Sequence, residues 1–295
     1  MNKLYVLLIT SMLLACKQQK ETNPITEVVS EAKVVIEKVD NHKLFSILGN
    51  FSKPLTNNLN ANIALSSIEG DKLFMYSKNN SSIPKLIYST PNIGNNFAWT
   101  KDGIHIVFKE KTADYQTKII KLNTTTLEKK ELKNLPKHTA LKALKISDTI
   151  YYLDQKTLAV KAKFKSKEWT ISSEKGNYYN IEVSPNNKYI IAHKGAFIYL
   201  FTTSGEFIRK LGKGIATAWH SNSKQIIGFI DSSVDGHQIT GSELYLYHIT
   251  DDPIQITHSV DEIETWPSFK NNSEVMFRDE KRNGVFSTNI KEYIN

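Results

Sequence analysis

A short hairpin pattern recurs along this chain, and it constrains the fold more than any other feature of the sequence. The clearest copy lies at residues 99–108, where the turn Trp-Thr-Lys-Asp-Gly leads into the apolar run Ile-His-Ile-Val-Phe. Asp, Asn and Gly accept the backbone conformations that a tight hairpin turn requires, and the apolar residues that follow favour a strand. Each copy therefore predicts one β-hairpin.

Six copies of the pattern follow one another at a nearly constant spacing. The five intervals between residues 69 and 271 average about forty residues each. A β-rich repeat of this length is typical of a β-propeller, whose blades stack around a central axis because no single sheet can bury both faces. We therefore predict an all-β fold, a propeller of six four-stranded antiparallel blades. The equivalent turn positions are Glu69, Asp102, Asp148, Asn186, Asn222 and Asn271.

The two ends of the repeat region predict how the ring closes. After the apolar run at residues 285–290 the chain is almost at its end, so the last blade lacks a fourth strand of its own. The apolar run at residues 44–48 is the candidate for that strand, and it would close the ring. Whether the first blade is complete stays open, because only one clear strand fits between residues 76 and 97.

The turns resemble degenerate copies of the Trp-Ser-Pro-Asp-Gly-Lys motif of TolB-like propeller repeats, with residues 99–103 as the nearest match. Residues 235–246 also resemble a segment found in bacterial lipoproteins of that family, where a loop leads into a strand. The resemblance covers about 250 residues, although the Ser-Pro-Asp-Gly core is intact in no copy. It implies the same six-bladed propeller that the repeat length predicts.

The N-terminus has the features of a bacterial export signal. Lys3 precedes an almost wholly apolar run at residues 4–15, which is shorter than the ~20 residues needed to span a bilayer. The run ends in Leu-Leu-Ala-Cys, which resembles the lipobox of bacterial lipoproteins. The resemblance implies that residues 1–15 are removed and that Cys16 carries the lipid. Because Cys16 is the only cysteine, a disulfide framework is excluded.

The segment after Cys16 differs in composition from the rest of the chain. Residues 17–42 contain no aromatic residue and are rich in Lys, Glu, Gln and Thr. We predict a lipidated tether at residues 16–42 and a propeller at residues 43–295. Lys17 stands where many lipoproteins of the inner membrane have aspartate, so we expect the outer membrane, with the protein facing the periplasm or the surface.

The formal net charge of +8 raises the question of a nucleic-acid partner. The lysines are spread along the chain, and no nucleic-acid-binding motif accompanies them, so we expect no such partner. A diffuse positive field is enough for a weak attraction to anionic lipid or polysaccharide. We expect a monomer without a cofactor.

Histidines are the residues that most suggest a metal site. His220, His237, His248 and His258 lack the short spacing of metal-binding motifs, although the loops of a propeller can bring distant residues together. Metal-dependent oligogalacturonate lyases resemble TolB-like propellers and use histidines on the central channel. A lyase of this type is therefore one alternative. No Gly-x-Ser-x-Gly motif or phosphate-binding glycine loop is present, so we assign no catalytic or metal-binding residue.

One long insertion and the tryptophans complete the list of candidates. Residues 231–241 form the longest insertion within a hairpin, and binding residues tend to occupy such loops. Trp99 and Trp219 precede equivalent hairpins, where large rings are expected to pack between blades, while Trp169 is expected to be more exposed. The candidate binding residues of the insertion are Asp231, Asp235, His237 and Gln238.

These features together favour a non-catalytic binding scaffold in the bacterial cell envelope. We expect a lipid-anchored disc that recognises a protein or glycan partner through its loops or its central funnel. The alternatives are the metal-dependent polysaccharide lyase and a lipoprotein that binds a small ligand.

Overall fold

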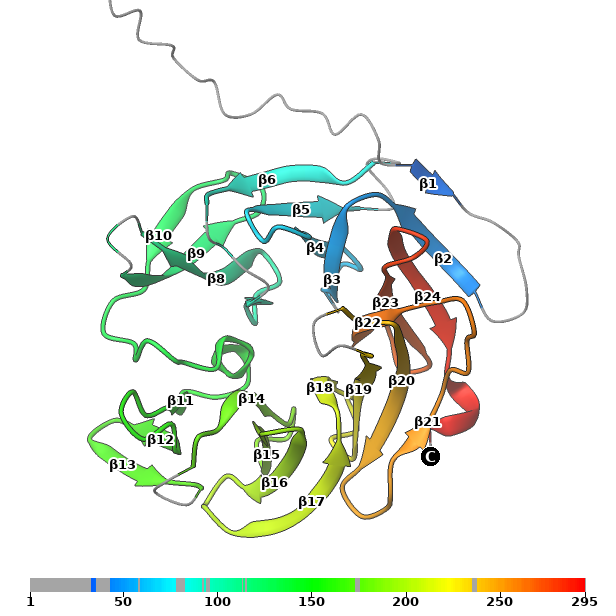
Figure 1. The fold of residues 1–295 in the computed structure, drawn as a ribbon. Helices are drawn as coiled ribbons and strands as arrows, with labels where there is room; N and C mark the ends of the chain where they lie inside the picture. The colour runs from blue at the N-terminus through cyan, green and yellow to red at the C-terminus, as the bar shows by residue number, and fades with distance from the viewer. Residues whose placement is uncertain are drawn as a thin grey trace, which may run out of the picture.

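The computed structural model describes residues 33–35, 43–57, 59–77, 83–91, 93, 96–112, 114, 116–172, 176–234 and 238–294. The strands in these ranges form six antiparallel sheets that are arranged as blades around a central axis (Figure 1). The prediction of an all-β, six-bladed propeller is confirmed. Within the same ranges no helix is long and apolar enough to cross a membrane. The predicted signal peptide and Cys16 lie outside the described residues.

From β3 onward the chain builds the blades in order, and every blade except the third begins with the strand nearest the axis (Figure 1). Blade one contains β3 (Phe51–Thr56), β4 (Ile63–Ser67), β5 (Lys72–Tyr76) and β6 (Lys85–Ser89). Blade two contains β7 (Phe97–Trp99), β8 (His105–Lys111), β9 (Thr117–Asn123) and β10 (Lys129–Glu131). Blade three contains β11 (Ile150–Leu153), β12 (Val160–Phe164) and β13 (Lys167–Thr170).

The last three blades complete the ring. Blade four contains β14 (Tyr179–Val183), β15 (Tyr189–Lys194), β16 (Phe197–Thr202) and β17 (Phe207–Lys213). Blade five contains β18 (Ile215–Trp219), β19 (Gln225–Ser232), β20 (Gly241–His248) and β21 (Ile254–Gln255). Blade six contains β22 (Glu264–Phe269), β23 (Glu274–Asp279), β24 (Gly284–Asn289), β2 (Lys43–Leu48) and, at its outer edge, β1 (Lys33–Val35).

The N-terminal strand β2 closes the ring as the sequence predicts. It pairs antiparallel with β24, with Ser46 opposite Phe286 and Ile47 opposite Val285. The side chain of Ile47 is wholly buried. Arg278 of β23 adds a second contact between blades six and one, because its guanidinium donates to the carbonyl of Phe51 in blade one. Within the predicted tether, β1 pairs with the outer edge of β2.

The first blade is complete, and the sequence signal for its inner strand is weak because Lys53 and Pro54 interrupt the apolar pattern. Lys53 has a positive φ of 33°, and the pairing of β3 with β4 shifts register between Ser52 and Leu55. This irregularity is a β-bulge, which locally bends a strand and redirects a side chain. The bulge therefore decides where the Lys53 side chain lies.

Blade three, in contrast, keeps only a remnant of its inner strand. Thr139 forms an isolated bridge with Tyr152, and the N–H of Ala140 donates to the carbonyl of Tyr151 at 2.8 Å. The 3-10 helix η1 (Leu141–Lys145) follows at once, and its first residue is buried against blade two. The chain thus leaves the strand after one bridge and places a helical turn beside the axis.

The recurring turns share one hydrogen-bonding pattern. The side-chain oxygen of the central Asp or Asn accepts a bond from the N–H two residues later, which mimics a backbone turn and sets the hairpin. The distances from acceptor to donor nitrogen lie between 2.8 and 3.0 Å. Four of the six positions identified as equivalent in the sequence make this bond: Asp102, Asn186, Asn222 and Asn271.

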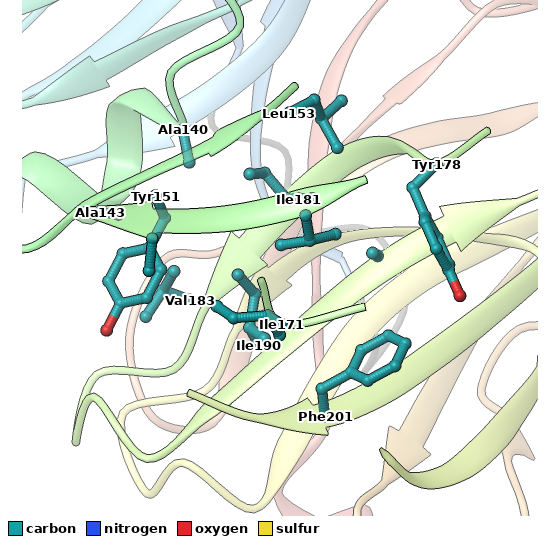
Figure 2. Packing of buried hydrophobic residues seen from close by; sticks show 13 residues of the cluster. Ala140, Ala143, Tyr151, Leu153, Ile171, Tyr178, Ile181, Val183, Ile190 and Phe201 are labelled. Carbon is teal, nitrogen blue, oxygen red and sulfur yellow. The ribbon is translucent and has the colours of Figure 1, made fainter. Parts of the chain in front are cut away.

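Apolar side chains fill the spaces between neighbouring blades. Figure 2 shows the cluster between blades three and four, where Tyr151 and Leu153 of β11 face Ile181 and Val183 of β14. Tyr151 carries a polar group into this cluster, and its hydroxyl donates to the side-chain oxygen of Asn187 at 2.8 Å. A rigid disc results, because each blade is packed on both faces.

The tryptophans before the hairpins join consecutive blades, as predicted. Trp99 of blade two is buried, and its indole N–H donates to the carbonyl of Leu55 in blade one at 2.9 Å. Trp219 of blade five is half-buried and donates in the same way to the carbonyl of Glu182 in blade four at 3.2 Å. Trp169 is more exposed than Trp99, as predicted.

Candidate binding site in the central channel

The central channel contains two cavities that share part of their lining. We call the first the Lys53 cavity; it has a volume of about 440 Å³ and is also lined by Lys109, His138 and Trp266. We call the second the turn cavity; it has a volume of about 630 Å³ and opens among the hairpin turns beside Trp99 and Trp219. Lys142 and Glu182 line both cavities and mark the boundary between them.

An ion pair forms the boundary between the cavities. The ammonium of Lys142 lies 2.8 Å from a carboxylate oxygen of Glu182 and also donates to the carbonyl of Thr217. Both side chains are largely buried. Lys142 belongs to η1, so it is the shortened inner strand of blade three that brings its charge to the axis. A buried carboxylate needs such a partner, because burial alone strongly disfavours its charge.

Lys53 lies in the same channel without an acidic partner. The bulge of β3 directs its side chain toward the axis, where the ammonium lies 5.5 Å from the ring centre of Trp266. No hydrogen bond or ion pair reaches this ammonium from the described residues. Burial, with the charge of Lys142, lowers the pKa of Lys53 to about 7, although the carboxylate of Glu182 acts in the opposite direction.

Other basic groups of the channel are similarly affected by burial. Burial lowers the pKa of Lys109 to about 8. It also lowers the pKa of Lys145, with a smaller contribution from the charge of Lys142. The pKa of His138 is lowered by burial and by the neighbouring charges of Lys109 and Lys137. The channel thus holds several amines that lose a proton more easily than lysines in water.

The charges that line the two cavities are strongly unbalanced. Among the described residues of the lining, Glu182 is the single carboxylate, and its charge is neutralised by Lys142. The positive potential of a narrow channel is stronger than that of a flat surface, because the walls exclude water. An anionic group is therefore the ligand type that the channel favours. The lysines of the lining are Lys53, Lys101, Lys109, Lys142, Lys145 and Lys270.

No family model matches this chain, and no curated protein matches it. The chain is similar in fold to the structure of a putative TolB from Agrobacterium tumefaciens, with a TM-score of 0.55 and 14% identity over 81% of this chain and 90% of that one. Its fold is TolB-like. It is also similar to the tricorn protease, with a TM-score of 0.53 and 12% identity over 82% of this chain, but this match covers only 25% of the protease.

A third similar structure is the β-propeller domain of Cps50 (Swd1) from Myceliophteria thermophila. The TM-score is 0.50 and the identity 8%, over 87% of this chain and 98% of that one. At such low identities the likeness concerns the fold alone. The chemistry of the channel therefore depends on the residues of this chain and does not follow from these similarities.

The described residues of the predicted binding loop are not among the residues that line the two cavities. Asp231 is exposed near the end of β19, where it lies opposite Ser242 of β20 in the sheet. Gln238 is also exposed. The charge of Asp231 contributes, after burial, to a raised pKa of Tyr179, which lines the Lys53 cavity. Asp235 and His237 lie outside the described residues.

The histidines considered for a metal site do not line the channel where the structure describes them. His220 is buried, donates through Nε2 to the carbonyl of Asn272 at 3.0 Å, and packs against Phe269. His248 is half-buried beside Asp251, and His258 is exposed. Within the described ranges, no three His, Cys, Asp or Glu residues form a group that could hold a metal ion.

His193 is a structural residue that the sequence reading missed. It is wholly buried and joins blade four to blade five. Its Nε2 accepts from the N–H of Ala216 at 2.9 Å, so its Nδ1 carries the proton and donates to the carbonyl of Asn180 at 2.8 Å. Burial lowers the pKa of this imidazole, which is neutral in the folded protein. Only the neutral ring can make both bonds.

We expect His193→Ala to lower the free energy of unfolding by about 2–4 kcal/mol, because two buried backbone groups lose their partners. Below the ordinary histidine pKa of 6.5 the unfolded chain binds a proton that folded His193 does not, so wild-type stability falls as the pH falls. The variant lacks this part of the pH dependence. Urea unfolding at pH 5 to 8 measures both effects, with His258→Ala as the exposed control. Equal pH slopes for His193→Ala and the wild type would contradict this assignment.

Proposed function

We propose that this protein is a non-catalytic binding module of the bacterial cell envelope, attached by a lipid on Cys16, that recognises a protein or glycan partner at its central channel. The observation that carries the proposal is the channel itself. Its two cavities meet at one ion pair and have walls built from several blades. A rigid, concave and chemically distinctive surface of this kind is typical of binding sites.

The geometry favours recognition without movement. The ring is closed between its first and last blades by β2 and Arg278, so the channel walls are fixed before a partner arrives. A preformed site loses little conformational entropy on binding, which increases affinity. The exposed side chain of Leu59 at the mouth of the turn cavity offers an apolar contact to a partner.

Site-specific photocrosslinking in cells tests the proposal. A benzophenone amino acid replaces Leu59 at the channel mouth and, as the matched control, Phe207 on the outer strand of blade four; both side chains are exposed. We expect a discrete adduct from position 59 at several times the yield from position 207. Mass spectrometry of the adduct identifies the partner. Equal yields from the two positions, or no adduct from either position, would contradict recognition at the channel.

A small-ligand-binding lipoprotein is the second candidate, because both cavities have the size of a site for a small molecule. Such sites usually measure about 300–1,000 Å³. If this candidate is correct, position 59 gives no adduct, while a small molecule raises the melting temperature of the purified protein.

A further inference from the structure

We propose that the Lys53 cavity is an anion-binding site for a ligand that carries two or more carboxylate or phosphate oxygens within reach of Lys53 and Lys109. The inference rests on the proposed function, since it names the ligand chemistry of the same channel. The scaffold alone does not explain why the side chains of Lys53 and Lys109 line this cavity.

Lys53 and Lys109 lack the acidic partners that Lys142 and Lys270 have. Lys142 is paired with Glu182, and Lys270 lies 2.7 Å from Glu274. Neither Lys53 nor Lys109 has a hydrogen bond or ion pair from its ammonium to any described residue. Placing an ammonium in a half-buried site without a counter-charge destabilises the fold. An anion that enters the cavity supplies the missing counter-charge.

The walls and the size of the Lys53 cavity also suit an anion. Trp266 forms an apolar wall beside Lys53, and the side chain of Asn96 at the rim makes no hydrogen bond to the described residues. An apolar wall reduces the contact of the ammonium with water, which strengthens its attraction to an anion. The volume of about 440 Å³ suits a small polyanion or the charged end group of a longer chain.

The field that surrounds the cavity is positive. The charged groups that act on Lys53 are Lys142 from η1 and Glu182 from β14, and Lys109 of β8 lines the same cavity and acts on His138. Because Glu182 is already paired, the net field at the cavity is positive. A bound anion would reverse the effect of burial and raise the pKa of both lysines, so binding takes up protons.

This linkage predicts how affinity depends on pH. In the empty cavity the pKa of Lys53 is about 7 and that of Lys109 about 8. Both amines are protonated at pH 6 and largely neutral at pH 9. Affinity for an anion is therefore highest at pH 6 and falls as the pH rises through 7 and 8.

Calorimetry on the full-length protein in detergent tests the proposal, with citrate and inorganic phosphate as probes and glucose as the neutral control. We expect citrate to bind at pH 6.5 and about tenfold or more weakly at pH 8.5, because each lysine that loses its proton contributes up to about tenfold per pH unit. At pH 7.5 the binding heat should differ between two buffers of different ionisation enthalpy, which reports the uptake of protons. The relative affinity for the two probes shows whether the site prefers carboxylate or phosphate.

Three variants assign the effect to the cavity. Lys53→Met and Lys109→Met should each weaken citrate binding by about tenfold or more and reduce proton uptake, whereas Lys85→Met on the outer strand of blade one should change neither. Lys53→Met should also raise the melting temperature, since it removes an unpaired ammonium, and this verifies that the variant folds. Undetectable binding of both anions at millimolar concentration, or unchanged binding in both cavity variants, would overturn the inference. A channel-mouth adduct obtained together with that result would leave the proposed function standing.

Discussion

A chain that begins at Gly49 is expected to melt at least about 6 °C below a chain that begins at Asp40. Both lack β1, so the difference between them reports β2 alone. The shorter chain loses the wholly buried side chain of Ile47 and the partly buried ring of Phe45. At about 1.5–3 kcal/mol for each side chain, the loss is about 3–6 kcal/mol, and each kcal/mol lowers the melting temperature of a domain of this size by about 2–4 °C.

The loss of β2 also leaves the outer edge of β24 without its hydrogen-bonding partner. An exposed edge of this kind is a site for pairing with another chain, so we also expect the shorter chain to aggregate on heating. Circular dichroism gives the melting temperatures, and light scattering gives the aggregation. Ile47→Ala in the longer chain should fall between the two truncations, at about 2–5 kcal/mol of destabilisation. Melting temperatures within about 2 °C of each other for the two truncations would refute the closure by β2.

The arrangement of the blades was predictable because it depends on local chemistry that repeats. The side chain of Asp102 closes its own turn, and Asn186, Asn222 and Asn271 do the same about one blade apart. The residue types that a tight turn requires can be recognised in a single sequence. Counting the apolar runs in each repeat shows that the last blade has one strand too few. The apolar run that forms β2 could therefore be predicted to close the ring.

The interior of the channel was not predictable, because it depends on the places where the pattern fails. Lys53 reaches the axis through a bulge in a strand whose sequence does not alternate, and Lys142 reaches it through a 3-10 helix that replaces most of a strand. Both lysines look like ordinary surface residues in the sequence. Tertiary structure alone therefore brings six lysines from different parts of the chain to the lining of the two cavities.

The candidate binding residues and His193 show the same difference between local properties and tertiary contacts. The insertion at residues 231–241 was chosen for its length and polarity, which are local properties, and its described residues are absent from the lining of the two cavities. His193, in contrast, gives no local signal, because it joins Asn180 of its own blade to Ala216 of the next blade. Contacts between blades decide which polar residues are buried, and these contacts join residues far apart in the sequence.

The second large effect is expected at the N-terminus. Cys16→Ser should abolish incorporation of a labelled fatty acid and move nearly all of the protein from the membrane fraction to the soluble fraction, because serine cannot form the thioether to the lipid. Stable attachment of a folded domain requires about two acyl chains or more, and the diffuse positive charge of the propeller is too weak to replace them. Ser11→Ala, in the apolar run that precedes Cys16, is the matched control and should stay in the membrane fraction.

The released Cys16→Ser protein also separates attachment from recognition. Cys16, the proposed site of the lipid, is far along the chain from the strands that line the channel. The soluble Cys16→Ser protein should therefore melt at the same temperature as the wild type and bind citrate as tightly. In cells, the yield of the adduct at position 59 should nevertheless fall several-fold if the partner is fixed in the membrane, because the local concentration that the tether provides is lost. Labelling and membrane attachment that persist in Cys16→Ser would contradict the assignment of the lipid to this cysteine.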